Sequence, residues 1–93
     1  MRGLVEAFVR RAGERTRTPF AVRFPGGGEY RNQEAAPAFT LAIRSPAAIA
    51  RIGAFGHIGL LESYFDGQLD IDGSLAAAMA VGMESGLAAN NWL

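Results

Sequence analysis

The sequence predicts a single α+β domain of 93 residues, in which a small, mostly antiparallel sheet carries helices on one side. Two observations support this fold class. Apolar residues alternate with polar ones in the middle of the chain, and they recur at helical spacing on both sides of that region. A chain of this length buries one core, so we expect a single domain over residues 1–93. Residues 1–19 are expected to form a helix and a linker, and residues 20–44 the strands. Residues 45–67 follow as short helices, and residues 68–89 as a strand and the closing helix.

A first helix is expected over residues 3–13, where Gly13 supplies a stop signal and five apolar residues share one side: Leu4, Val5, Phe8, Val9 and Ala12. A period of two then runs from Phe20 to Phe24 and predicts a strand. The three glycines at 26–28 turn the chain into a short returning strand over residues 29–31. No helix follows these glycines, so they indicate a hairpin turn and not a phosphate loop. The clearest strand runs from Phe39 to Arg44.

Ser45 and Pro46 predict a helix start, as N-cap and first helical residue. A second short helix is expected from His57 to Phe65. Residues 68–72 alternate again, with Leu69 and Ile71 inward and two aspartates outward. This favours a strand over a calcium loop, which would need a glutamate where Met79 stands. The last helix begins at Gly73–Ser74, and small or apolar residues on one of its faces are expected to pack against a sheet or a partner: Leu75, Met79, Gly82, Met83 and Gly86.

Composition excludes several functional classes. There is no cysteine, which excludes a disulfide scaffold, a thiol nucleophile and a thiolate zinc site. The nine basic and nine acidic residues balance, which argues against nucleic acid as a partner. The charges are unevenly placed, because residues 1–31 hold seven arginines and three glutamates. The sequence has no apolar run of the length that a signal peptide or a spanning helix requires, so we expect a cytoplasmic protein.

No set of residues supplies a nucleophile, a base and an orienting group, so the isolated chain is not expected to be catalytic. The single histidine, His57, has no evident catalytic partner. Glu62 lies among apolar residues and is expected to have a fixed hydrogen-bond donor. No metal site is predicted.

Residues 56–73, with the sequence GHIGLLESYFDGQLDIDG, carry a specific pattern. They resemble the N-terminal segment of cyclopropane-fatty-acyl-phospholipid synthases, which has a pattern close to G-x-x-G-L-G-E-[SA]-Y-[MF]-x-G-x-[LW]. Leu61 stands where that pattern has a glycine. The likeness covers about residues 20–88, and the matching positions are Gly56, Gly59, Leu60, Glu62, Ser63, Tyr64, Phe65, Gly67 and Leu69.

The resemblance implies an accessory domain with a sterol-carrier-like α+β fold, preceding a methyltransferase domain. That domain would use S-adenosyl-L-methionine (SAM) to add a methylene group across the double bond of phospholipid acyl chains. No position here matches the family's catalytic motifs, so no cofactor is expected in this chain. The implied partners are a phospholipid membrane surface, the C-terminal methyltransferase domain and a second copy of the chain. The implied location is cytoplasmic, peripheral to the inner membrane face.

Two interpretations of the apolar helix residues remain open: an ordinary core, or the wall of a lipid-contacting groove between sheet and helices. The residues concerned are Phe55, Ile58, Leu61, Tyr64, Phe65, Met79 and Met83. Candidates for contact with a membrane surface are the arginines of the first helix and its linker: Arg2, Arg10, Arg11, Arg15 and Arg17. The alternative function is a protein-interaction or dimerisation module that docks through its closing helix without lipid affinity.

Overall fold

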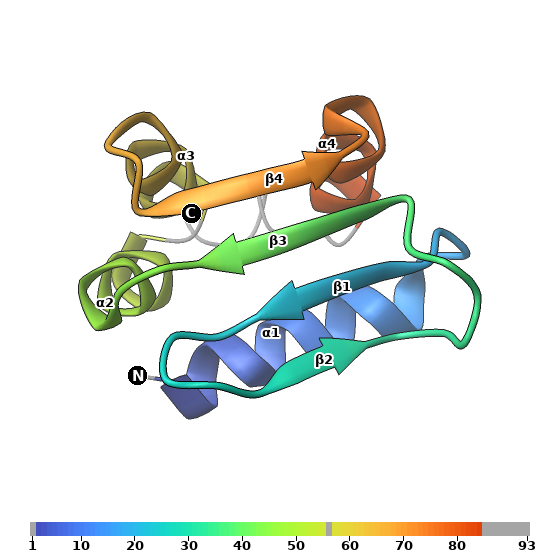
Figure 1. The fold of residues 1–93 in the computed structure, drawn as a ribbon, viewed down its shortest axis with the longest axis horizontal. Coiled ribbons are helices and arrows are strands. Elements are labelled where there is room, and N and C mark those ends of the chain that lie inside the picture. The colour runs from blue at the N-terminus through green and yellow to red at the C-terminus, as the bar shows by residue number, and fades with distance from the viewer. Residues whose placement is uncertain (1, 56, 85–93) are drawn as a thin grey trace.

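The computed structural model describes residues 2–55 and 57–84 and has an α+β fold, with four strands in one sheet and helices against one of its faces (Figure 1). The predicted element order is confirmed. The helices are α1 (Arg2–Arg15), α2 (Pro46–Phe55), α3 (His57–Phe65) and α4 (Leu75–Glu84). The strands are β1 (Phe20–Arg23), β2 (Glu29–Arg31), β3 (Phe39–Ile43) and β4 (Leu69–Gly73).

The sheet is mixed, with the strand order β2-β1-β3-β4. β1 pairs antiparallel with β2 and β3 pairs antiparallel with β4, as expected, but the central pair β1–β3 is parallel. The parallel pair forms because β3 returns to the free edge of β1 and not to β2. There Phe39 stacks on Phe20 with ring centroids 5.2 Å apart, and Ala38 N–H donates to the Pro19 carbonyl at 2.8 Å. Burying two aromatic rings together stabilises this pairing.

The core lies between the sheet and the helices. Alternate strand residues point into it, among them Val22, Phe39, Ile43 and Leu69, and Val5, Ile49, Ile52 and Val81 meet them from α1, α2 and α4. Figure 1 shows α1 lying behind β1 and β2, so the viewer looks onto the opposite face of the sheet. The intervening residues of the strands form that open face.

The helix starts follow the predicted capping chemistry. Ser45 Oγ accepts a hydrogen bond from Ala48 N–H at 3.2 Å, with Pro46 as the first residue of α2. Ser74 Oγ accepts from Ala77 N–H at 3.0 Å in the same way at the start of α4. α4 turns Val81 inward and leaves Leu75 and Met79 exposed. Leu75 and Met79 therefore do not pack against the sheet, because Val81 on the other side of the helix fills the core position. Packing of this face against a partner stays a prediction.

Candidate functional site

The inner side of α3 consists of small residues that permit a close approach to α2. A Cβ atom on Gly59 would overlap the Arg51 carbonyl oxygen and lie 3.0 Å from Ile52 N. Ser63, one turn later, is fully buried. The two helices therefore pack backbone against backbone at this point, and only glycine fits at position 59. These two motif residues serve the packing of the helix pair.

The C-terminus of α3 is closed by a Schellman motif. Gly67 has φ +76°, its N–H donates to the Tyr64 carbonyl at 3.2 Å, and Gln68 N–H donates to the Ser63 carbonyl at 2.8 Å. The left-handed conformation favours glycine at position 67. The turn at Asp66–Gly67 reverses the chain from α3 into β4.

The outer side of α3 carries exposed apolar side chains, with exposed Glu62 beside them. Phe65 is 79% exposed, Ile58 44% and Tyr64 37%, and Leu61 between them is half-buried. The Tyr64 and Phe65 rings contact each other at a tilt, with centroids 5.8 Å apart. The structure thus places Ile58 and Phe65 on an outward face and not in the core. Tyr64 is exposed as well, and it lines a hollow together with residues of the sheet. We call Ile58, Leu61, Tyr64 and Phe65 the α3 apolar face.

The remaining motif and helix candidates divide between surface and interior. Leu60 is half-buried and packs against the core, and Met79 on α4 is 54% exposed. Glu62 is exposed, and its carboxylate makes no hydrogen bond or ion pair among the described residues. The expected fixed donor for Glu62 is not found among the described residues, because α3 turns this side chain toward solvent. Gly56 and the side chains of Phe55, His57 and Met83 lie outside the described residues.

Two of the five candidate membrane-contacting arginines are held by the hairpin. Arg2 pairs with Glu6 at 3.0 Å, donates to the carbonyls of Pro25 and Gly27 at 3.2 and 3.0 Å, and stacks on Phe24. Arg10 lies over the Tyr30 ring, 5.2 Å from its centroid. Arg11, Arg15 and Arg17 are exposed. The spacing of charges in the sequence does not show this division, because it depends on where the hairpin folds back against α1.

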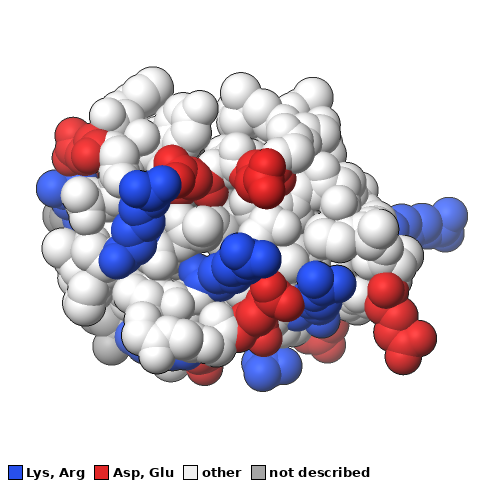
Figure 2. Space-filling view, in the orientation of Figure 1, with Lys and Arg blue, Asp and Glu red and all other residues white. Residues whose placement is uncertain are grey.

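The open face of the sheet carries charged side chains on its outer strands and small side chains on β3 between them. In register across the strands lie Arg23, Ala42 and Asp70, and in the next row Ala21, Thr40 and Asp72. Figure 2 shows basic and acidic side chains interspersed on this face. Arg44 pairs with Asp70 here, and Arg51 pairs with Asp66 at 2.6 Å at the end of α3.

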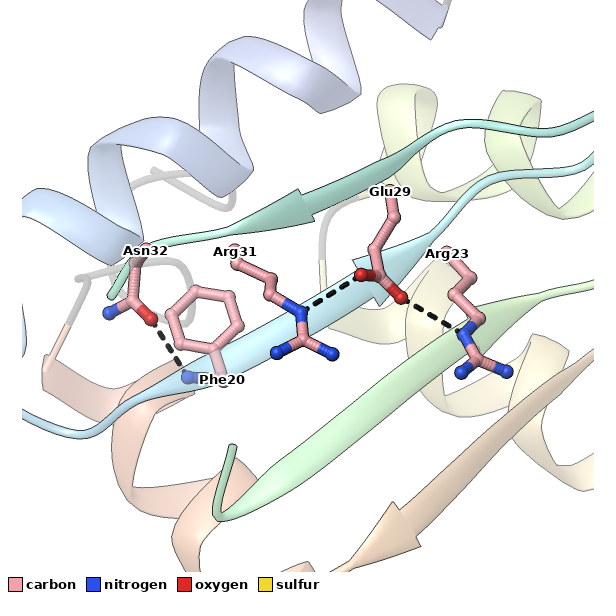
Figure 3. Close-up of polar contacts among 5 residues, drawn as sticks. All are labelled: Phe20, Arg23, Glu29, Arg31 and Asn32. Atoms are coloured by element: carbon pink, nitrogen blue, oxygen red, sulfur yellow. Dashed lines mark hydrogen bonds and ion pairs between the residues drawn. The ribbon is translucent and has the colours of Figure 1, made fainter. Parts of the chain in front are cut away.

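Glu29 joins two arginines on this face (Figure 3). It accepts from Arg31 Nε at 2.9 Å and from Arg23 Nε at 3.1 Å. The hydrogen bond from Arg31, followed by that from Arg23, lowers the pKa of the Glu29 carboxyl below its usual value. Beside this chain of charges the open face holds a shallow hollow of about 450 Å³, and Arg23 and Tyr64 are among its lining residues.

Asn32 is a structural residue that the sequence pattern does not reveal. Its Oδ1 accepts from Phe20 N–H at 2.8 Å, as Figure 3 shows, and its Nδ2 donates to the carbonyls of Thr18 and Gly13 at 2.9 and 3.3 Å. One side chain thereby ties the end of α1, the linker and the start of β1 together. An asparagine after a strand is typical of any loop, so only the tertiary arrangement identifies this role.

Comparisons with known proteins add no family assignment: no protein-family model and no curated protein matches the chain. Among the described residues, no helix is long and apolar enough to cross a membrane. The glycines at 26–28 have positive φ and lead into β2, so the predicted hairpin turn is confirmed.

Proposed function

We propose that this chain is a lipid-engaging accessory domain of a cyclopropane-fatty-acyl-phospholipid-synthase-like methyltransferase. The observation that carries the proposal is the α3 apolar face, in which Phe65 is 79% exposed within the segment that resembles this family. Exposed aromatic and aliphatic side chains gathered on one helix are typical of a surface that contacts an apolar partner. Catalysis and SAM would belong to a C-terminal methyltransferase domain, and the protein would work on the cytoplasmic side, peripheral to the inner membrane face.

The fold does not need the outward side chains of α3. The helix is held by Gly59 and Ser63 on its inner side and by the Gly67 turn at its end, so Phe65 and Tyr64 are available for a partner. Removing an exposed phenylalanine from water into the acyl boundary of a bilayer is favourable by about 2 kcal/mol. A short apolar face of this kind supports reversible association with a membrane surface.

The arginines of α1 and its linker add a salt-sensitive electrostatic attraction to an anionic membrane surface. Arg11 and Arg17 are exposed, whereas Arg2 and Arg10 are engaged by the hairpin. Each arginine near an anionic surface contributes about 1 kcal/mol, and salt screens this attraction beyond about 8 Å at physiological ionic strength. We expect vesicles containing anionic lipid to bind more of the protein at low salt than at high salt.

Vesicle co-sedimentation tests the proposal. Phe65→Ser should reduce the bound fraction several-fold at every salt concentration while leaving the melting temperature unchanged. Leu75→Ser is the matched control, because Leu75 is also exposed but lies on α4. Equal binding of both variants and the parent chain, or no binding to any vesicle at low salt, would contradict lipid engagement through α3.

Exposed Leu75 and Met79 on α4 favour the alternative function, a dimerisation or protein-interaction module. Residues 75–83 of this helix contain no charged side chain, so its outer surface can approach an apolar partner. Sedimentation velocity over a range of protein concentrations checks this alternative. A dimer that Met79→Gln dissociates, in a protein that binds no vesicles, would replace the lipid proposal.

A further inference from the structure

The hollow on the open sheet face has a floor of small side chains and opposite charges at its two ends. Ala42 and Thr40 of β3 form the floor, Arg23 of β1 lines one end, and Asp70 and Asp72 of β4 line the other. β1 and β4 are separated by two strand spacings, about 10 Å. Arg23 lines the hollow while its Nε is bound to Glu29 of β2, on the other side of β1.

The charged groups at both ends keep unused hydrogen-bonding capacity. Arg23 uses only Nε for Glu29, and within the described residues its two Nη groups make no other hydrogen bond; Figure 3 shows them turned away from Glu29. The Arg23 side chain is 66% exposed. Asp72 is exposed, and its carboxylate has no partner in the described part of the chain. Asp70 shares one carboxylate oxygen with Arg44.

Tyr64 connects this hollow with the α3 apolar face. The tyrosine lines the hollow, and in the same helix it contacts the exposed Phe65. A tyrosine ring beside two carboxylates is a favourable environment for an ammonium group. A molecule whose charged part occupies the hollow can therefore extend its apolar part past Tyr64 along α3.

We propose that this hollow binds the zwitterionic headgroup of a phospholipid, with the phosphate at Arg23 and the ammonium between Asp72 and Tyr64. The inference rests on the proposed lipid engagement and names the lipid chemistry it selects. An isolated anion meets two aspartates at one end, and an isolated cation meets Arg23 at the other. A ligand that carries both charges in separate groups pairs with both ends at once.

Backbone amide NMR of the full 93-residue chain, titrated with glycerophosphoethanolamine, tests the site. We expect saturable shifts at Thr40, Ala42 and Asp72, and weaker binding of glycerol 3-phosphate and of ethanolamine. Arg23→Gln and Asp72→Asn should each weaken binding of the zwitterion about two- to fivefold. Arg31→Gln is the matched control, because Arg31 binds Glu29 on the same face without lining the hollow.

Changes at Tyr64 separate the ring from its hydroxyl. Tyr64→Phe should keep the affinity for the zwitterion, and Tyr64→Ala should lower it about two- to fivefold. Equal binding of glycerol 3-phosphate and glycerophosphoethanolamine would overturn the proposal in favour of a simple anion site at Arg23. Titration without shifts at the three strand residues would overturn it as well.

Failure of this site is distinguishable from failure of lipid engagement. Vesicle binding that depends on Phe65, without any response to the soluble headgroup, would leave the accessory function standing and remove the headgroup site. A response to the soluble headgroup in a protein that binds no vesicles would establish the hollow as a site for free phosphodiesters and contradict the lipid source. Binding of both, with Phe65→Ser affecting only vesicles, is the expected result.

Discussion

The hairpin side of the molecule and the α2–α3 side are held together in different ways. Around α1, β1 and β2, polar side chains make the long-range contacts: Arg2 binds the hairpin carbonyls, and Asn32 bridges α1, the linker and β1. Between α2 and α3 the backbones themselves meet over Gly59. The first region uses its distinctive side chains to fold, whereas the second leaves large apolar side chains in solvent. The proposal of lipid engagement rests on this contrast, because only exposed apolar side chains are available to a membrane surface.

Gly59→Ala should break the second region and have the largest effect. The new methyl group would overlap the Arg51 carbonyl oxygen, so α2 and α3 must separate, at a cost of about 3 kcal/mol in the free energy of unfolding. Chemical denaturation measures this value. Ser63→Ala is the control at the same interface: it removes a buried hydroxyl without a hydrogen-bond partner in the described part of the chain, and should be neutral or stabilising. A stable Gly59→Ala variant would mean that the helices do not cross there.

The same glycine explains why the orientation of α3 could not be predicted from the sequence. Ile58, Leu61 and Phe65 recur at helical spacing and predict a face that is buried or lines a groove. The structure buries the side with Gly59 and Ser63, because close backbone packing needs small residues and not large apolar ones. Hydrophobicity alone selects the opposite side. Similarly, nothing local in α4 indicates that Val81 packs inward while Met79 stays exposed.

Local signals did predict most element boundaries. Ser45–Pro46 and Gly73–Ser74 mark helix starts through capping chemistry, and the alternation in residues 39–43 marks β3. The parallel pairing of β1 with β3 was beyond reach, because it depends on the stacking of Phe20 and Phe39 across a long connection. The hollow could not be predicted for the same reason, since only this strand order brings Arg23 and Asp72 to the same hollow.

Asn32→Ala should break the first region with a smaller effect. It removes three hydrogen bonds at a partly buried junction and leaves the Phe20 N–H without its partner, so we expect a loss of about 2 kcal/mol in the free energy of unfolding. Gln33→Ala is the matched control, since Gln33 donates one exposed hydrogen bond to the Arg17 carbonyl. Its cost should stay below about 0.5 kcal/mol. Similar losses in the two variants would show that Asn32 is not a junction residue.

Gly67→Val should destabilise the α3 end by about 1.5 kcal/mol, because a β-branched residue adopts a φ of +76° only with strain. No neighbouring atom crowds this position, so the effect reports backbone conformation alone. Gly67→Asn should recover most of the loss, since asparagine tolerates the left-handed region. Thermal unfolding of the two variants provides the comparison. An unchanged melting temperature for Gly67→Val would contradict the Schellman turn.

Glu29→Gln should have the smallest effect on stability. Glu29 lies on the open face of the sheet, which both regions share. The pKa of its carboxyl is lowered in the folded protein, first by the hydrogen bond from Arg31 and then by that from Arg23. A lowered folded-state pKa contributes stability above the unfolded value, about 4.5, and that contribution is lost as the pH falls through the folded-state pKa. Acid unfolding curves should therefore be less steep in Glu29→Gln than in the parent chain below pH 4.5 and parallel to it near pH 7. Glu34→Gln is the control, because Glu34 is exposed and no ion pair holds its carboxylate in the described structure. If Glu29→Gln and Glu34→Gln follow the same acid limb, Glu29 does not tie the two arginines together in solution, and Arg23 would be free to turn both edges of its guanidinium toward the hollow.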